Sequence, residues 1–306
     1  MQKKQVKQKP YEPTPLDNLI LQYVREYHFL TAELLVDIHF SKGSLTRAQT
    51  KLKVLSETGY LSRRRLPHIG VGNPEYIYYL ATKGQRYLQE QGFAGFSRVR
   101  PSDIEEMKYP HLEHALSLNE VLIAARLLTR SVPEITLAGM QHDLDLKKSP
   151  AKFTYERRMP DGYKIDEKAT IVPDAWLDFR LTLPNTEKKR RKCIVFELDR
   201  GTMSMTPFKQ KLRAYVHYAQ ENGAYYQQFG TNAITVAYAT TAGEDRCKAM
   251  VSWCEDELQE QRLEHEADLF RFTALPKDEI NPTNLFCTLV WYTPYTKQPL
   301  TLLWKQ

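Results

Sequence analysis

Hydrophobic and polar residues follow helical spacing in three early segments and then change period. The three segments are residues 15–27, 30–40 and 41–61. After the helix stop at Gly59, apolar and polar residues alternate, which predicts two strands within 61–69 and 75–82, joined by GVGNP. A further helix is expected at about 83–91. Three helices followed by a β-hairpin predict a winged helix-turn-helix over residues 15–92.

The third helix is predicted to have an inner and an outer side. Ser44 is its expected N-cap, as Thr31 is for the second helix. The inward apolar stripe consists of Leu45, Ala48, Leu52 and Leu55. The outward positions are Thr46, Arg47, Gln49, Thr50, Lys51 and Lys53.

Charge indicates the partner of this first domain. Residues 1–100 hold 16 Lys and Arg against 8 Asp and Glu, whereas the remainder holds 27 against 29. A basic domain of this fold predicts double-stranded DNA as the partner; a small helical domain with a solvated basic face is the alternative. Arg47 and Gln49 suit base reading, whereas Ser44, Lys51 and the arginines of the hairpin suit phosphates. The candidate DNA-binding residues are Ser44, Thr46, Arg47, Gln49, Lys51, Arg63, Arg64 and Arg65, with His68 on the hairpin and Lys3, Lys4, Lys7 and Lys9 in the tail.

A second domain follows a segment with turn formers and no clear period. Residues 111–132 are apolar around nearly the whole helix, so we expect this helix to be buried. Its His114 is expected to be a hydrogen-bonded core histidine rather than a metal ligand, and Glu120 would join a carboxylate cluster if it points inward. The predicted divisions are a basic tail (1–14), the winged helix-turn-helix (15–92), a linker (93–109) and the second domain (110–306).

The rest of the chain predicts a mixed sheet with helices packed against it, and so an α+β protein with an α/β second domain. Strands are expected within 134–146, 152–159, 171–181, 192–200, 233–241, 269–275 and 285–293. Helices are expected over 206–221 and 245–263. The chain shows no apolar run of about 20 residues, no secretory h-region and no paired cysteine motif, so we expect a cytoplasmic protein with reduced thiols and no membrane partner.

The segment CIVFELDRGT (193–202) ends an apolar strand in two carboxylates. Because strand side chains alternate, Glu197 and Asp199 are expected to share one face, about 7 Å apart. Such like charges need a cation nearby, unless the strand simply runs into a solvated turn that Asp199 begins with Gly201. Arg200 as an internal partner would make the site structural, and we favour this interpretation. The Thr202 hydroxyl is expected to cap the next helix.

An acid before one strand and a second acid at the end of the next is the layout of the PD-(D/E)XK nuclease fold. Two such acids hold Mg²⁺, and a lysine positions or activates the attacking water. Asp174 and Glu197 fill the acid places and are the candidate metal ligands. Asp199 stands in the place of the lysine, so the lysine would come from the next helix, as Lys209 or Lys211. These five are the candidate catalytic residues; Mg²⁺ is expected only if the site is active, and no other cofactor is implied.

The loop of this hairpin, PNTEKKRRK (184–192), holds five consecutive basic residues, Lys188 to Lys192. A solvated hairpin tip explains them, and a phosphate-tracking edge would match the DNA prediction.

Over residues 15 to 240 the chain resembles the replication-relaxation family of plasmids and other mobile elements. The resemblance rests on the winged helix, HALSLNE (114–120), PDA (173–175), ELDRGT (197–202) and the helix with Lys211 and Tyr215. The last pair is similar to a Gln-x-x-x-Tyr motif of some nucleases. The resemblance implies a DNA-binding protein linked to plasmid replication and DNA relaxation.

Three functions therefore remain open. The first is a DNA-binding protein of replication or its control with a non-catalytic second domain. The second is a Mg²⁺-dependent nuclease or nickase directed by the winged helix. The third is a transcriptional repressor that dimerises through its second domain. A second copy of the chain or replication and mobilisation proteins are the further partners considered.

Overall fold

The structure is a computed structural model that describes residues 11–67, 75–93, 100–182, 189–276 and 280–304. Its contacts divide the chain into two units, Met1–Leu112 (unit 1) and Glu113–Gln306 (unit 2), and each is described by itself. The tail lysines, His68, the GVGNP turn and Lys188 lie outside the described residues. None of the described helices is long and apolar enough to cross a membrane. All four cysteines are free thiols.

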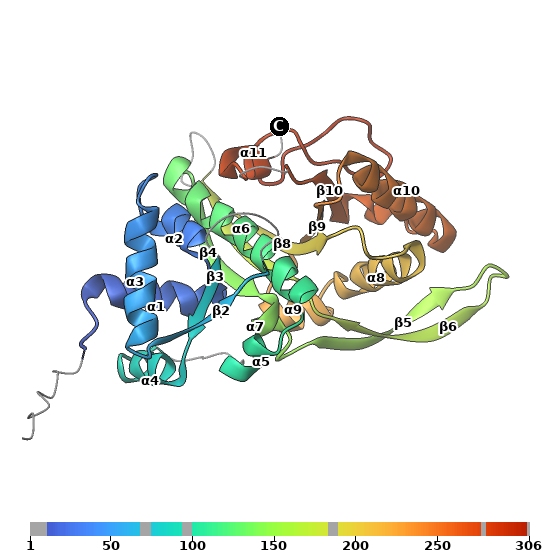
Figure 1. The fold of residues 1–306 in the computed structure, drawn as a ribbon. Coiled ribbons are helices and arrows are strands. Elements are labelled where there is room, and N and C mark those ends of the chain that lie inside the picture. Colours follow the sequence, from blue (N-terminus) through green and yellow to red (C-terminus); the bar gives the residue numbers. More distant parts are fainter. Residues whose placement is uncertain (1–10, 68–74, 94–99, 183–188, 277–279, 305–306) are drawn as a thin grey trace, which may run out of the picture. The chain divides into compact units, whose positions relative to one another are not determined.

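Unit 1 has the predicted order of three helices followed by a β-hairpin (Figure 1). Its helices are α1 (Pro15–Tyr27), α2 (Ala32–His39), α3 (Leu45–Glu57), α4 (Thr82–Glu90) and α5 (Pro101–Glu105). Its strands β1 (Phe29–Leu30), β2 (Leu61–Arg65) and β3 (Tyr76–Leu80) form an antiparallel sheet in the order β1-β3-β2. The predicted N-cap Thr31 accepts a hydrogen bond from the Leu34 amide, whereas Ser44 occupies its N-cap position without a side-chain bond to the helix.

The inner side of α3 is largely as the periodicity predicts. Ala48, Leu52 and Leu55 are fully buried. Leu45 is 36% exposed, so its prediction as a core residue is wrong. Leu45 is the first residue of the helix, where no preceding turn covers the side chain.

The segment predicted as a linker contains a short helix that packs within unit 1. The guanidinium of Arg64 donates hydrogen bonds to the carbonyl oxygens of Ile104 (2.8 Å) and Met107 (2.7 Å). The Tyr79 hydroxyl donates to Glu105 on α5 at 2.9 Å. Five helical residues are too few to produce a visible hydrophobic period, which is why the sequence did not indicate α5.

Unit 2 is built on a five-stranded mixed sheet in the order β10-β9-β8-β7-β4 (Figure 1). Its strands are β4 (Ile135–His142), β5 (Ala151–Arg158), β6 (Lys164–Ile171), β7 (Ala175–Thr182), β8 (Lys189–Asp199), β9 (Thr235–Thr240) and β10 (Phe270–Ala274). Its helices are α6 (Tyr109–Ser131, which begins in unit 1), α7 (Asp143–Leu146), α8 (Met205–Tyr218), α9 (Ala224–Phe229), α10 (Glu244–Gln261), the 3₁₀ helix η1 (Glu264–Leu269) and α11 (Pro282–Cys287). β8, β9 and β10 are parallel, and β4 and β7 complete the sheet with antiparallel pairs.

Several elements of unit 2 differ from the sequence prediction, and α9 and η1 are among those that were not predicted. β6, which pairs with β5 in a two-stranded ribbon, was not predicted, because most of its own residues are exposed and its apolar residues do not alternate cleanly with polar ones. The strand expected over 285–293 begins as α11, where the Asn281 side chain caps the helix start. The strand expected over 134–146 ends at His142, where α7 begins. At α11 and α7 a side-chain cap at the helix start outweighs the strand propensity of the segment.

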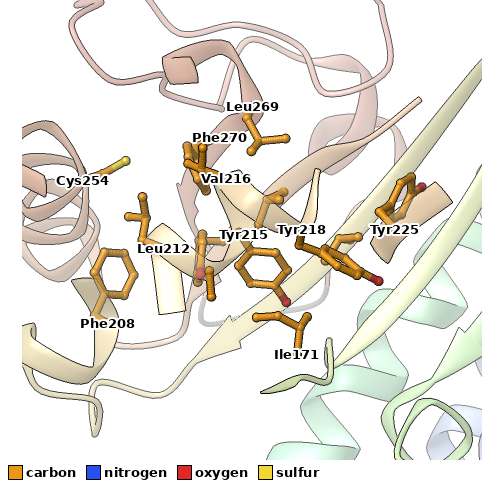
Figure 2. Packing of buried hydrophobic residues seen from close by; sticks show 14 of the residues in the cluster. Ile171, Phe208, Leu212, Tyr215, Val216, Tyr218, Tyr225, Cys254, Leu269 and Phe270 are labelled. Atoms are coloured by element: carbon orange, nitrogen blue, oxygen red, sulfur yellow. The ribbon is translucent and has the colours of Figure 1, made fainter. Parts of the chain in front are cut away.

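The core of unit 2 lies between α8 and one face of the sheet. Figure 2 shows Phe208, Leu212 and Tyr215 of α8 packed together in this core. The Phe208 ring lies 5.2 Å from the Tyr238 ring of β9, measured between centroids. Cys193 and Val195 of β8 belong to the same cluster. This packing fixes α8 over β8, and it therefore positions any polar side chain on the inner side of α8 above the end of that strand.

Candidate functional site

The two acids at the end of β8 share the face that α8 covers. Alternation from Val195 places Glu197 and Asp199 on this face, as the sequence predicts. Both are buried, with 3% of Glu197 and 8% of Asp199 exposed. The interpretation as a strand that runs into a solvated turn is therefore wrong for both residues. Buried carboxylates must be paired or protonated, so their partners decide what the site can do.

Glu197 is held by two side chains that lie one turn apart on α8. The Lys211 ammonium donates to Oε2 of Glu197, and the Tyr215 hydroxyl donates to Oε1. The four-residue spacing puts both donors on the inner side of the helix. Lys211, one of the two lysines predicted to come from this helix, thus lies at the acid, whereas Lys209 pairs with Glu260 of α10 at 2.9 Å.

Asp174, just before β7, lies beside this pair and has its own donors. Its Oδ2 accepts a hydrogen bond of 2.8 Å from the backbone amide of Leu198. Its Oδ1 lies 3.3 Å from Nε2 of His114, on α6. His114 is thus a hydrogen-bonded histidine, as expected, but it belongs to the acid cluster rather than to an apolar core.

The pKa values show how these charges compensate one another. Burial raises the pKa of Glu197 to about 7, although the charge of Lys211 opposes the shift. Burial would also raise the pKa of Asp174, but the hydrogen bond from His114 and the charge of Lys211 lower it overall. The carboxylates in turn raise the pKa of Lys211 and His114, against the effect of burial. Near neutral pH, Asp174 and Lys211 are therefore ionised, whereas Glu197 is present in both its protonated and its ionised form.

Asp199 has a separate set of partners. Arg246 of α10 binds it with two parallel hydrogen bonds, 2.8 Å from Nε and 2.9 Å from Nη2. The Thr240 hydroxyl (2.8 Å) and the Gly201 amide (3.0 Å) also donate to it. Gly201 has a φ of +76°, and a Cβ there would lie 2.8 Å from the Cβ of Ala242. Asp199 thus fixes the turn after β8 to β9 and α10.

Three sequence expectations around these acids are corrected. The cation that binds Asp199 is Arg246 and not Arg200, because Arg200 turns to Glu113 on α6. Glu120 is exposed, so it lies outside the buried acid cluster. Thr202 does not cap α8, because the helix begins after Ser204.

Mg²⁺ does not fit this arrangement of side chains as it stands. Two carboxylates are suitable ligands, but all four of their oxygens already face protein donors, and Lys211 supplies the compensating cation. Within the described ranges, no group of three or more His, Cys, Asp or Glu side chains is arranged to hold a metal ion. A cleft of about 300 Å³ opens beside Lys211, between β6 and α8, with Tyr155 and Ile171 among its lining residues.

The candidate DNA-binding residues of unit 1 divide into two groups. Thr46, Arg47 and Gln49 are exposed on α3, and Arg63 and Arg65 are exposed on β2.

The other two basic candidates have internal partners. The Lys51 ammonium lies 3.1 Å from Oδ1 of the fully buried Asp17, and Arg64 binds the backbone carbonyls of the α5 segment. Ser44 is half-buried, and its hydroxyl lies 3.1 Å from that of Ser41. Lys51, Arg64 and Ser44 thus shape the surface that α3 and the hairpin present.

Sequence reasoning missed Arg246 and the contact between His114 and Asp174. HALSLNE drew attention to His114, but nothing in its spacing pointed to Asp174. Arg246 carried no signal at all, because it opens an ordinary amphipathic helix.

Comparison with known proteins gives one finding. The family model described as replication-relaxation matches residues 21–235. No curated protein and no solved structure gave a significant match to the chain. The matched range holds α3, the hairpin of unit 1, Asp174, Glu197 and Lys211, and it ends before Arg246.

Proposed function

The chain belongs to the replication-relaxation family, and we propose that it is a DNA-binding protein that acts in the replication or relaxation of a plasmid or other mobile element. Unit 1 is the DNA-binding part, a winged helix-turn-helix whose α3 enters the major groove. Unit 2 is a nuclease-like domain of the PD-(D/E)XK type without catalytic activity. Double-stranded DNA is the partner.

The observation that carries the proposal is the outer surface of α3. Thr46, Arg47 and Gln49 are exposed together on one helix that packs its opposite side into the unit. An arginine can bind guanine and a glutamine can bind adenine through two hydrogen bonds each. Exposed Arg63 and Arg65 on the hairpin add charge suited to phosphates.

The non-catalytic role of unit 2 follows from its satisfied acids. Glu197 and Asp174 are compensated by Lys211, Tyr215 and His114 without an ion. A carboxylate whose oxygens all accept protein hydrogen bonds is a poor ligand for Mg²⁺, because binding must first break those bonds.

Base reading by α3 is tested with the full-length chain. Arg47→Ala should lower discrimination between the preferred duplex and an unrelated one by about 1 to 3 kcal/mol, measured as the ratio of Kd values. Lys53→Ala, which removes a charge from the same helix at a residue paired with Glu57, is the matched control and should leave the ratio unchanged. If the wild-type chain binds no duplex, the proposed function is wrong. A footprint at an origin supports replication, whereas a footprint at the chain's own promoter supports the repressor alternative.

A Mg²⁺-dependent nuclease is the second candidate, and one observation favours it. Lys211 reaches Glu197 from the following helix and its charge also acts on Asp174, which is the placement expected of a relocated catalytic lysine. Nicking of supercoiled plasmid by the wild-type chain in Mg²⁺, lost in Asp174→Asn and in Lys211→Ala but kept in Lys209→Ala, would establish this function.

A further inference from the structure

The stem of the β7–β8 hairpin concentrates positive charge in unit 2. The register pairs Arg180 with Arg191, Leu181 with Arg190 and Thr182 with Lys189. We call the basic stem the five residues Arg180, Lys189, Arg190, Arg191 and Lys192. Among the described residues 178–182 and 189–193, the one acid is Asp178. This excess stands out because residues 101–306 as a whole hold slightly more acids than bases.

Asp178 orders two arginines of the basic stem. It accepts hydrogen bonds from Nε and Nη2 of Arg191 at 3.2 and 2.9 Å, and from Nη1 of Arg180 at 2.9 Å. The Asp178 side chain is only 6% exposed, whereas 30% of Arg191 and 34% of Arg180 remain exposed. One buried carboxylate thus fixes two guanidiniums and leaves both with an outer edge toward solvent.

The second hairpin of unit 2 carries acids as well as bases. In the ribbon of β5 and β6, Lys164 pairs with Glu156 at 2.7 Å and Arg157 lies 3.8 Å from Glu167. These acids lie diagonally across the strands from the bases, and the Lys164 ammonium, directly opposite Arg158, is thereby compensated. In the basic stem, Arg180 and Arg191 lie directly opposite each other and share the single carboxylate of Asp178, whereas in the described register no acid is directly opposite Lys189, Arg190 or Lys192.

We infer that the basic stem is a second DNA-contacting surface, which binds the phosphate backbone and reads no bases. Arginines that are already oriented bind phosphate with two hydrogen bonds at a small entropy cost. Lys189 and Arg190 are exposed; alternation places Lys189 on the face of Arg191 and Arg190 on the opposite face, so positive charge lies on both faces of this end of β8. The inference rests on the proposed function, since the family and unit 1 favour DNA as the polyanion. An acidic protein surface is the competing partner.

The test measures duplex binding by the full-length chain between 50 and 200 mM salt, on two unrelated sequences. Lys189→Ala/Arg190→Ala should lower the log–log salt slope by about 1.8, because each lost phosphate contact removes about 0.9. The rise in Kd between the two salt concentrations should then shrink by about 12-fold for both sequences. Lys189→Arg/Arg190→Lys keeps the charges and should keep the slope.

The matched control is Lys164→Ala/Lys248→Ala, which removes the same charge from lysines that are 56% and 75% exposed elsewhere in unit 2. It should bind as the wild type does; an equal loss of slope would mean that net charge acts, and would overturn the inference. An unchanged slope in Lys189→Ala/Arg190→Ala would also overturn it and would favour an acidic protein partner. Because Arg47→Ala tests base reading separately, the basic stem can fail while the proposed function stands.

Discussion

Glu197 and Asp199 lie on one strand, on one face and two residues apart, yet they have opposite electrostatic environments. Burial raises the pKa of Glu197 to about 7. For Asp199, burial is outweighed by the hydrogen bonds from Arg246 and Thr240, so its pKa falls below the ordinary value. The two pKa shifts differ because the side chains have different hydrogen-bond partners, and not because of burial, since both residues are nearly inaccessible to solvent.

The comparison shows which of the two acids is suited to chemistry. Asp199 is bound by a planar guanidinium, a hydroxyl and a backbone amide, which fit the carboxylate and stay in place. Glu197 is bound by a flexible lysine and a tyrosine, beside a second acid and next to a cleft. Asp199 therefore stabilises the fold, whereas Glu197 can change its protonation state near neutral pH.

The largest effect is expected from breaking the Asp199 pair. Arg246→Ala should lower the free energy of unfolding by roughly 3 to 5 kcal/mol, because it leaves a buried carboxylate without its cation. Lys209→Ala removes a cation from Glu260, which is 60% exposed, and should cost at most about 1 kcal/mol. Urea unfolding of both variants measures the two values. An equal small loss in both would mean that Asp199 is compensated by Thr240 and Gly201 alone.

The next effect concerns pH and Glu197. Between the ordinary carboxyl pKa of 4.5 and about 7, the unfolded chain has lost a proton that folded Glu197 still holds. The free energy of unfolding should therefore fall as pH rises through this window, by up to about 3 kcal/mol. His114 acts in the same direction, because its raised pKa stabilises the fold at low pH and this is lost as pH rises through the folded value.

Glu197→Gln should remove the larger part of this decrease in the free energy of unfolding with rising pH. The wild-type minus variant difference isolates Glu197 from other titrating groups, such as His217, whose pKa is lowered by burial. Urea unfolding at pH 5, 6, 7 and 8 gives the difference. If the free energies of unfolding of the wild type and the variant change in parallel between pH 5 and 8, Glu197 is ionised throughout this range. Its ion pair with Lys211 would then be as stable as that of Asp199 with Arg246.

The part of this site that the sequence predicted is the part that depends on local periodicity. Alternation in β8 placed both acids on one face, and helical spacing offered Lys209 and Lys211, of which only the inner one reaches Glu197. Arg246 could not be predicted, because it lies 47 residues from Asp199 and meets it only when α10 packs beside α8. The same limit applies to Asp178, whose role depends on the cross-strand register. Short elements such as α5 and α11 were missed because their ends are set by single contacts rather than by a repeating pattern.

The smallest expected effect is that of Mg²⁺. A ligand raises the melting temperature only if it binds the folded chain, and Mg²⁺ would have to displace Lys211, Tyr215 or His114 from oxygens they already hold. We therefore expect the melting temperature of the wild type in millimolar Mg²⁺ to equal that in NaCl of the same ionic strength. Asp174→Asn is the control, since it removes one of the two acids and should be equally insensitive. A Mg²⁺-dependent rise that disappears in Asp174→Asn would show that Lys211 gives way to an ion. Glu197 would then be a metal ligand, unlike Asp199. The Mg²⁺-dependent nuclease would replace the non-catalytic role proposed for unit 2.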